Sequence, residues 1–207
     1  MNFKTFIMII ENKGEFDVSE LLEHKANIKI IEFKNISEII NLKLLSDFKL
    51  LTELKFSTCF IENNRLDLSG TSINTLTISN CYFNINDIIM PSSLKHLIIR
   101  STTINDFNVY DNIKKIVKLE YDLCDFIISP SNSDLKNLKA IEIISLTNCK
   151  GLSNLDAFLN ISSPLKIYLK NTDTLASISS INDNVDLEIE LYKKIKISNK
   201  GLKIITE

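Results

Sequence analysis

One eleven-residue pattern recurs along the chain, and it constrains the fold more than any other feature of the sequence. In residues 73–83, INTLTISNCYF, apolar residues stand at places 1, 4, 6 and 11 and a cysteine stands at place 9. Two further copies fit at all five places: Leu51, Leu54, Phe56, Cys59 and Ile61, and then Ile116, Leu119, Tyr121, Cys124 and Phe126. Recurrence at a nearly constant interval is typical of a solenoid, in which each repeat packs only against its neighbours.

The pattern resembles the leucine-rich repeat, L-x-x-L-x-L-x-x-N/C-x-L, whose units are about 20 to 29 residues long. An eighth, degenerate repeat is expected around Leu187 and Ile189, and Ile189 with Leu191 fits almost as well. The resemblance covers residues 28–192. It implies a strand-rich α/β solenoid, a single array with a parallel concave sheet and short helices or extended returns on the convex side. The first seven repeats begin at Ile28, Leu51, Ile73, Leu94, Ile116, Ile141 and Pro164.

We interpret residues 1–207 as one leucine-rich-repeat domain with a cap at each end. Residues 1–27 fit the pattern poorly, and TFIMII followed by Asp17 and Glu20 in capping-box spacing predicts an N-terminal strand–helix cap. Residues 28–192 hold seven to eight repeats. Residues 193–207 predict a C-terminal β-hairpin cap that turns at Asn199-Lys200-Gly201 and pairs with the last repeat strand. Such caps would cover the two open edges of the array.

The return segments between strands are short, which excludes long helices on the convex side of most repeats. Residues 37–48, SEIINLKLLSDF, have apolar spacings of three and four and predict a short helix. Residues 133–138 and 153–160 have room for a turn or two of helix. Residues 63–72 and 105–115 are expected to return as extended or 3₁₀ segments.

Charge and hydropathy exclude several classes of partner. A net charge of −2 and a pI near 5.8 give no basic footprint for nucleic acid, so we expect no nucleic-acid partner. The early apolar run, residues 6–10, is shorter than the roughly 7 to 15 residues of a signal-peptide core. No run approaches the about 20 apolar residues of a membrane span. We therefore expect a cytoplasmic protein that has no membrane partner and is monomeric on its own.

The four cysteines share one place of the pattern. The resemblance implies that this place points inward and carries Asn, Cys or Thr, whose polar atom bonds the backbone of the turn after the strand. Zinc sites use cysteines or histidines two to four residues apart, and no such pair exists here, so we expect no metal. A disulfide between adjacent rungs is the alternative, but thiols engaged with the backbone favour the reduced state and a reducing compartment. The set is Cys59, Cys81, Cys124 and Cys149.

No motif for catalysis or for a cofactor is present. The four glycines are isolated, and no phosphate loop, nucleophile elbow or metalloprotease helix occurs. We expect no enzymatic activity, no catalytic residue and no cofactor. The alternative is an effector or enzyme that uses His96 beside Glu120 and Asp122. An open face without a pocket neither excludes water nor preorganises charge, and this argues against that alternative.

The exposed strand face is the expected binding surface, because alternate residues of a strand share a face. Its second half mixes charged, apolar and aromatic side chains, the combination of Arg and aromatic anchors that protein interfaces use. We therefore predict a non-enzymatic protein–protein interaction module that binds a partner protein on the concave sheet. The predicted contact residues are His96, Ile98, Arg100, Lys118, Glu120, Asp122, Ile143, Tyr168 and Lys170.

Two other roles remain open for such a scaffold. One is an immunity or inhibitor protein that neutralises a toxin or enzyme in a one-to-one complex. The other is a bacterial or viral effector that acts on a host protein. The segment from Met90 to Leu97, MPSSLKHL, resembles the P-x-S-L-x-x-L phrase of FNIP-type repeats and of the repeats in bacterial ubiquitin-ligase effectors. The residues left after the repeats are too few for a separate ligase domain.

Overall fold

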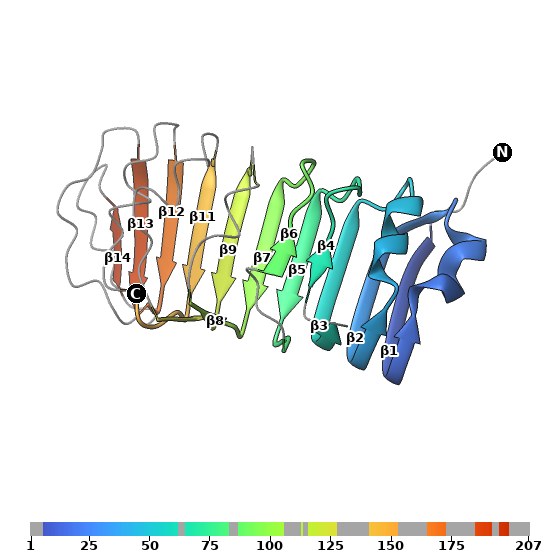
Figure 1. Cartoon of the computed structure of the whole chain (residues 1–207). Helices are drawn as coiled ribbons and strands as arrows, with labels where there is room; N and C mark the ends of the chain where they lie inside the picture. The colour runs from blue at the N-terminus through green and yellow to red at the C-terminus, as the bar shows by residue number, and fades with distance from the viewer. Residues whose placement is uncertain are drawn as a thin grey trace.

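The computed structural model describes residues 6–61, 65–82, 87–105, 113, 116–127, 141–152, 165–172, 185–191 and 195–198. In this part of the chain a ten-stranded sheet runs the whole length of the molecule, in the order β1-β2-β3-β5-β7-β9-β11-β12-β13-β14 (Figure 1). Its strands are β1 (Phe6–Asp17), β2 (Ile28–Ile40), β3 (Glu53–Ile61), β5 (Thr75–Ser79), β7 (His96–Arg100), β9 (Lys118–Asp122), β11 (Ile143–Thr147), β12 (Leu165–Lys170), β13 (Val185–Leu191) and β14 (Ile195–Ser198).

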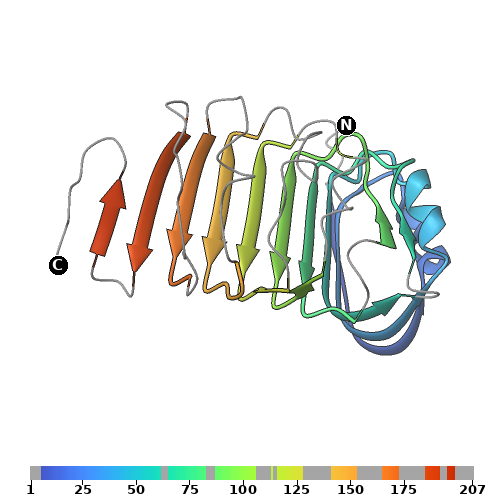
Figure 2. The same cartoon turned by 60° about the vertical axis from the view of Figure 1, so that its left-hand side comes forward.

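The sheet is parallel from β1 to β13, and its register follows the repeat pattern. Between β3 and β5, Leu54 pairs with Leu76 and Phe56 with Ile78. The same places pair at every later step as far as β12 and β13, where Ile167 lies opposite Leu187. Each repeat therefore contributes one strand, and Figure 2 shows the strands side by side in a single row. The prediction of a strand-rich solenoid with a parallel sheet is confirmed.

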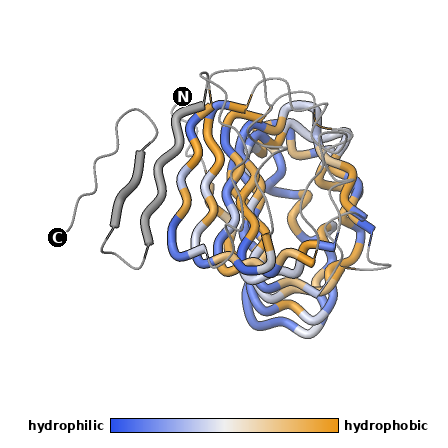
Figure 3. The backbone as a smooth tube through the Cα atoms, turned by 90° about the vertical axis from the view of Figure 1, so that its left-hand side faces the viewer, coloured by the Kyte–Doolittle hydropathy of each residue, from blue (hydrophilic) through white to orange (hydrophobic). Residues whose placement is uncertain are grey.

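Apolar side chains at places 1, 4 and 6 form one continuous core between the sheet and the returns. Leu54, Leu76, Leu97 and Leu119 are each 0% exposed, so a column of leucine runs through successive coils. Near the N-terminal end, Phe16 and Phe56 lie on either side of Phe33, with ring centroids 5.8 and 5.5 Å from it. Figure 3 shows the matching alternation of hydrophobic and hydrophilic residues along the strands. Burial on this scale, about 25 cal/mol per Å² of apolar surface, is the main force that holds the coils together.

Each coil turns its corner at a residue in the left-handed backbone region, which Asn tolerates better than most residues. This residue stands directly before place 9. Its side chain also links coils: the Nδ2 group of Asn35 donates to Oδ1 of Asn12 at 2.9 Å, and that of Asn171 to Oδ1 of Asn148 at 3.1 Å. The corner residues, all with φ between 49° and 57°, are Asn12, Asn35, Thr58, Asn80, Ser101, Leu123, Asn148 and Asn171.

The Cys or Thr side chain at place 9 points inward and donates hydrogen bonds to backbone carbonyl groups, as the resemblance to leucine-rich repeats implies. The Cys59 thiol donates to the carbonyl of Ser57 in its own coil at 3.2 Å and to that of Phe33 in the preceding coil at 3.4 Å. The Thr172 hydroxyl makes the equivalent pair of bonds, to Lys170 and Leu146, both at 3.3 Å. Because a buried polar group must find a partner, one short donor closes the turn after the strand in each described coil from Cys59 to Thr172, whereas Ile36 fills this place in the coil before them.

The N-terminal segment contains the expected strand and helix in that order. β1 pairs with β2 in parallel, in the same way as the later strands pair with one another, so it continues the ladder. The helix that follows is the 3₁₀ helix η1 (Val18–His24), and Asp17 caps it by accepting a bond from the Ser19 amide at 2.8 Å. Glu20 forms an ion pair with Lys13 at 3.4 Å. Asp17 is thus the N-cap, but its bond goes to Ser19 instead of Glu20.

Residues 37–48 contain less helix than their apolar spacing predicts. That prediction is wrong in its first part, because Ser37 to Ile40 continue β2; only η2 (Leu42–Asp47), a 3₁₀ helix, follows. The other described returns are two-residue strands: β4 (Leu66–Asp67) pairs with β6 (Ile88–Ile89), and β8 (Thr103–Ile104) pairs with β10 (Asp125–Phe126). The helices expected at 133–138 and 153–160 and most of the return at 105–115 lie outside the described residues.

At the C-terminal end, β14 pairs antiparallel with β13, so the first of the two expected C-terminal β runs borders the last repeat strand. The turn expected at Asn199-Lys200-Gly201 lies outside the described residues. In the described part of the chain, no helix is long and apolar enough to span a membrane.

Candidate functional site

The predicted contact residues all lie on the outer face of four consecutive strands, which we call the β7–β12 face. Parallel register places His96 opposite Lys118, Ile98 opposite Glu120, and Arg100 opposite Asp122. Lys118 in turn lies opposite Ile143 on β11. Tyr168 and Lys170 stand one strand further along, opposite Ser145 and Thr147. The members of the β7–β12 face are His96, Ile98, Arg100, Lys118, Glu120, Asp122, Ile143, Tyr168 and Lys170.

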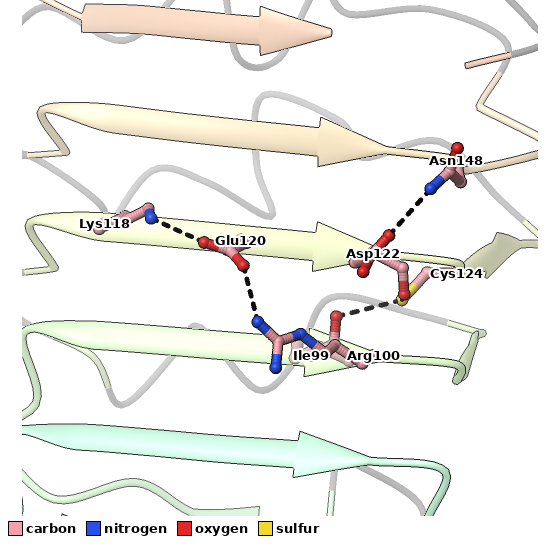
Figure 4. A network of polar contacts seen from close by, with 7 residues as sticks. All are labelled: Ile99, Arg100, Lys118, Glu120, Asp122, Cys124 and Asn148. Carbon is pink, nitrogen blue, oxygen red and sulfur yellow. Dashed lines mark hydrogen bonds and ion pairs between the residues drawn. The ribbon is translucent and has the colours of Figure 1, made fainter. Parts of the chain in front are cut away.

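Glu120 is the centre of an ion cluster on this face. Its Oε1 atom lies 3.2 Å from an Arg100 Nη atom on the neighbouring strand, and its Oε2 atom lies 2.7 Å from Lys118 Nζ (Figure 4). The Glu120 side chain is only 19% exposed, whereas those of Arg100 and Lys118 are 44% and 37% exposed. The carboxylate is therefore held between two cations that remain partly in solvent.

Two opposing effects set the pKa of Glu120. Burial alone would raise it, because desolvation disfavours the charged carboxylate. The hydrogen bonds and positive charges of Lys118 and then of Arg100 outweigh burial and lower the pKa below its ordinary value. Glu120 is thus held as a carboxylate near neutral pH, and the cluster presents a fixed pattern of charge.

His96 makes no hydrogen bond or ion pair with Glu120 or Asp122 in the described part of the chain. Its partner in register is Lys118, a cation, while Glu120 is occupied by Arg100 and Lys118. Asp122 accepts a hydrogen bond from Asn148 Nδ2 at 3.2 Å. Within the described residues, no group of three or more His, Cys, Asp or Glu side chains is placed to hold a metal ion.

Leu123, at the end of β9, is a residue that sequence reasoning missed. It is the one described corner residue that is large and apolar, it has φ of 55°, and it is 56% exposed. The left-handed region costs about 1–2 kcal/mol for a residue of this kind, and strain of this kind often marks a functional position. The signal was present in the sequence, because every other described corner carries Asn, Ser or Thr directly before place 9.

A second missed feature lies on the corner side of the array. Phe60 and Tyr82, which directly follow place 9 in adjacent coils, stack with ring centroids 4.5 Å apart and an angle of 8° between ring planes. They are 44% and 55% exposed. The recurrence of an aromatic residue at place 10 in two successive repeats was the available signal. Phe60 lies on β3 and Tyr82 follows the end of β5 by three residues, so the stack belongs to coils outside the β7–β12 face.

Comparisons with known proteins add a distant relative. No family model and no solved structure matches the chain. Over 157 residues, 74% of this chain, the sequence is 27% identical to the disease resistance protein RPS4B of Arabidopsis thaliana. The match covers 13% of that protein, so the chain spans a small part of its length. Together with the stacked coils, this similarity fits a repeat protein with a solenoid fold.

Proposed function

We propose that the chain is a leucine-rich-repeat array that binds a partner protein and performs no catalysis. Three features support the repeat type: the spacing of the pattern, the single strand contributed by each repeat, and the inward donor at place 9. The reduced, backbone-bonded thiols fit a cytoplasmic location.

The binding surface in this proposal is the β7–β12 face. The carrying observation is the Arg100–Glu120–Lys118 cluster, which fixes an Arg side chain on an open sheet, three strands from the exposed ring of Tyr168. Arg and Tyr are the residue types that most often dominate binding energy at protein interfaces. Ile98 on β7 and Ile143 on β11 are half-buried on the same face and supply apolar contact area.

Affinity capture with a triple variant tests this placement. The full chain and the variant Arg100→Ala/Glu120→Ala/Tyr168→Ala are immobilised in equal amounts and exposed to lysate of the source organism. The matched control, Glu53→Ala/Lys55→Ala/Thr75→Ala, changes the same sheet face near the other end and removes the Lys55–Glu53 ion pair of 2.9 Å.

The expected result is a partner protein that the wild-type chain and the control retain and that the triple variant loses. All three proteins should unfold at similar denaturant concentrations, because the altered side chains lie outside the core. Retention by the triple variant would refute the placement on the β7–β12 face. Loss by the control alone would move the site to β3 and β5.

A further inference from the structure

Two pairs of cysteines stand in register on adjacent coils. Beyond the strand pairing of Ser57 with Ser79, the Tyr82 amide donates to the Cys59 carbonyl at 3.1 Å, so the two coils stay side by side past their corners. The Lys150 amide donates to the Cys124 carbonyl at 2.9 Å in the equivalent way. Cys59 therefore neighbours Cys81, and Cys124 neighbours Cys149. All four thiols are free.

The spacing of adjacent coils is compatible with a bond between neighbouring sulfurs. Strands in a sheet lie about 4.8 Å apart. Disulfides form across Cα separations of about 4.4 to 6.8 Å, which includes this value. Both side chains of each pair point inward from the same place of the repeat, and each thiol donates to the carbonyl two residues before it, at 3.2 Å for Cys59 and 3.4 Å for Cys81.

The two pairs differ in access to solvent. Cys124 and Cys149 are both 0% exposed. Cys59 is also 0% exposed, but Cys81 is only partly buried and packs against the margin of the core. A small oxidant in water can therefore reach one thiol of the first pair and neither thiol of the second.

Hydrogen bonding within the first pair also favours a thiolate. The bond from the Cys81 thiol lowers the pKa of Cys59 to about 7, against the opposing effect of burial. The same bond, with burial, raises the pKa of Cys81. The first negative charge of the pair therefore lies on Cys59, and this thiolate can accept the proton of the neighbouring Cys81 thiol, which makes the Cys81 sulfur reactive towards peroxide.

We propose that Cys59 and Cys81 are a peroxide-oxidisable dithiol that forms a reversible disulfide between adjacent coils. The Cys59 thiolate takes the proton of the Cys81 thiol as the Cys81 sulfur attacks hydrogen peroxide. An S–O bond forms, the O–O bond breaks, and the departing hydroxide takes up from solvent the proton that Cys59 first released, which gives one water. The Cys59 sulfur then attacks the sulfenic sulfur, an S–S bond forms, the S–O bond breaks, and the hydroxyl group leaves with the Cys59 proton as a second water. Two thiols are oxidised and one peroxide is reduced. Accessible thiols beside a second cysteine behave in this way in redox-sensing proteins.

Intact-mass spectrometry of the full chain tests the proposal. The reduced protein is treated with hydrogen peroxide under native conditions, its remaining thiols are alkylated after unfolding, and peptides are mapped without reductant. The expected product has lost two hydrogens, retains two of its four thiols and contains one cross-linked peptide that joins Cys59 to Cys81. Dithiothreitol should restore all four thiols.

Substitutions by threonine separate the two pairs, since Thr172 shows that the place accepts a hydroxyl. The variant Cys124→Thr/Cys149→Thr should form the cross-link as the wild type does. The variants Cys59→Thr and Cys81→Thr should not lose two hydrogens. A cross-link between Cys124 and Cys149, addition of two oxygens to Cys81 in place of a disulfide, a disulfide between two chains, or no reaction while the protein is folded would each overturn the proposal.

Discussion

The Asn148 side chain donates to Asp122 Oδ1 at 3.2 Å, across two neighbouring coils, beside the apolar corner residue Leu123. Three described pairs of neighbouring coils have a bond between their corner side chains, as Asn35 has with Asn12. Leu123 has no polar side-chain atom for such a bond, and the acceptor for Asn148 is the preceding residue, Asp122. This corner lies at the edge of the β7–β12 face.

Replacing Leu123 by Asn should stabilise the protein. Asn adopts the left-handed conformation at lower cost than Leu, so we expect the free energy of unfolding to rise by about 1 kcal/mol. Urea titration followed by circular dichroism measures the change. The control is Leu50→Asn, at another exposed leucine, 51% accessible and without positive φ, which should leave stability nearly unchanged. Equal effects at the two positions would contradict the assignment of strain to Leu123.

Gly151 should not tolerate alanine. It has φ of +77°, and a Cβ atom there would lie 2.0 Å from the Phe126 carbonyl oxygen. We expect Gly151→Ala to lower the free energy of unfolding by more than about 1 kcal/mol. Gly14→Ala is the matched control, because nothing lies within 4 Å of a Cβ atom at Gly14. Chemical denaturation measures the stability of both variants. If Gly151→Ala were as stable as Gly14→Ala, this account would be wrong.

In the coils from Cys59 to Thr172, the inward place should require a donor as well as the right volume. One coil earlier the place is filled by Ile36, which is buried and has no donor. Cys124 bonds the carbonyls of Ile99 and Asp122, each at 3.5 Å. Thr can keep such bonds, as Thr172 does, whereas Val has a similar shape and no donor. We therefore expect Cys124→Val to be less stable than Cys124→Thr by about 1 kcal/mol in thermal or urea unfolding. A more stable Val variant would show that apolar volume alone decides this place.

The ion cluster should make stability depend on pH at acidic values. The pKa of Glu120 is lowered in the folded protein, so its contribution is fully present above the ordinary glutamate pKa and is lost as the pH falls through the folded value. The difference in unfolding free energy between wild type and Glu120→Gln should be larger at pH 7 than at pH 3. It should also shrink at high salt, which screens partly exposed charges. A difference that does not change between pH 7 and pH 3 would contradict the ion pairing.

The sheet could be predicted from the sequence because its register depends on side-chain burial alone. Place 4 is leucine or isoleucine in each of the first seven repeats, and a shift by one residue would expose the whole column. Of the two registers that the sequence allows for the eighth repeat, the structure has the one in which Leu187 and Ile189 lie opposite Ile167 and Leu169. The returns carry no such constraint. Residues 37–48 have helical spacing, yet pairing with β1 and β3 extends β2 as far as Ile40.

The positions of the face residues were predictable, but their contacts were not. Alternation along a strand places Arg100, Glu120 and Asp122 outward without any structure. Register alone would pair Arg100 with Asp122, directly opposite, whereas the guanidinium reaches Glu120 and Asn148 occupies Asp122. Such choices depend on side-chain reach and on corner conformation. The positive φ of Leu123 is likewise a property of the folded corner. The sequence indicates it only through the Asn, Ser and Thr residues that stand at the same place in other repeats.

Isothermal titration of the captured partner against the purified chain tests the central claim most directly. The account predicts one-to-one binding by the wild type. Affinity should fall at least about 100-fold, or roughly 3 kcal/mol, in Arg100→Ala/Glu120→Ala/Tyr168→Ala. Affinity should stay within about twofold in Glu53→Ala/Lys55→Ala/Thr75→Ala, a change well below 1 kcal/mol. Wild-type affinity in a folded Arg100/Glu120/Tyr168 variant would contradict binding through the β7–β12 face.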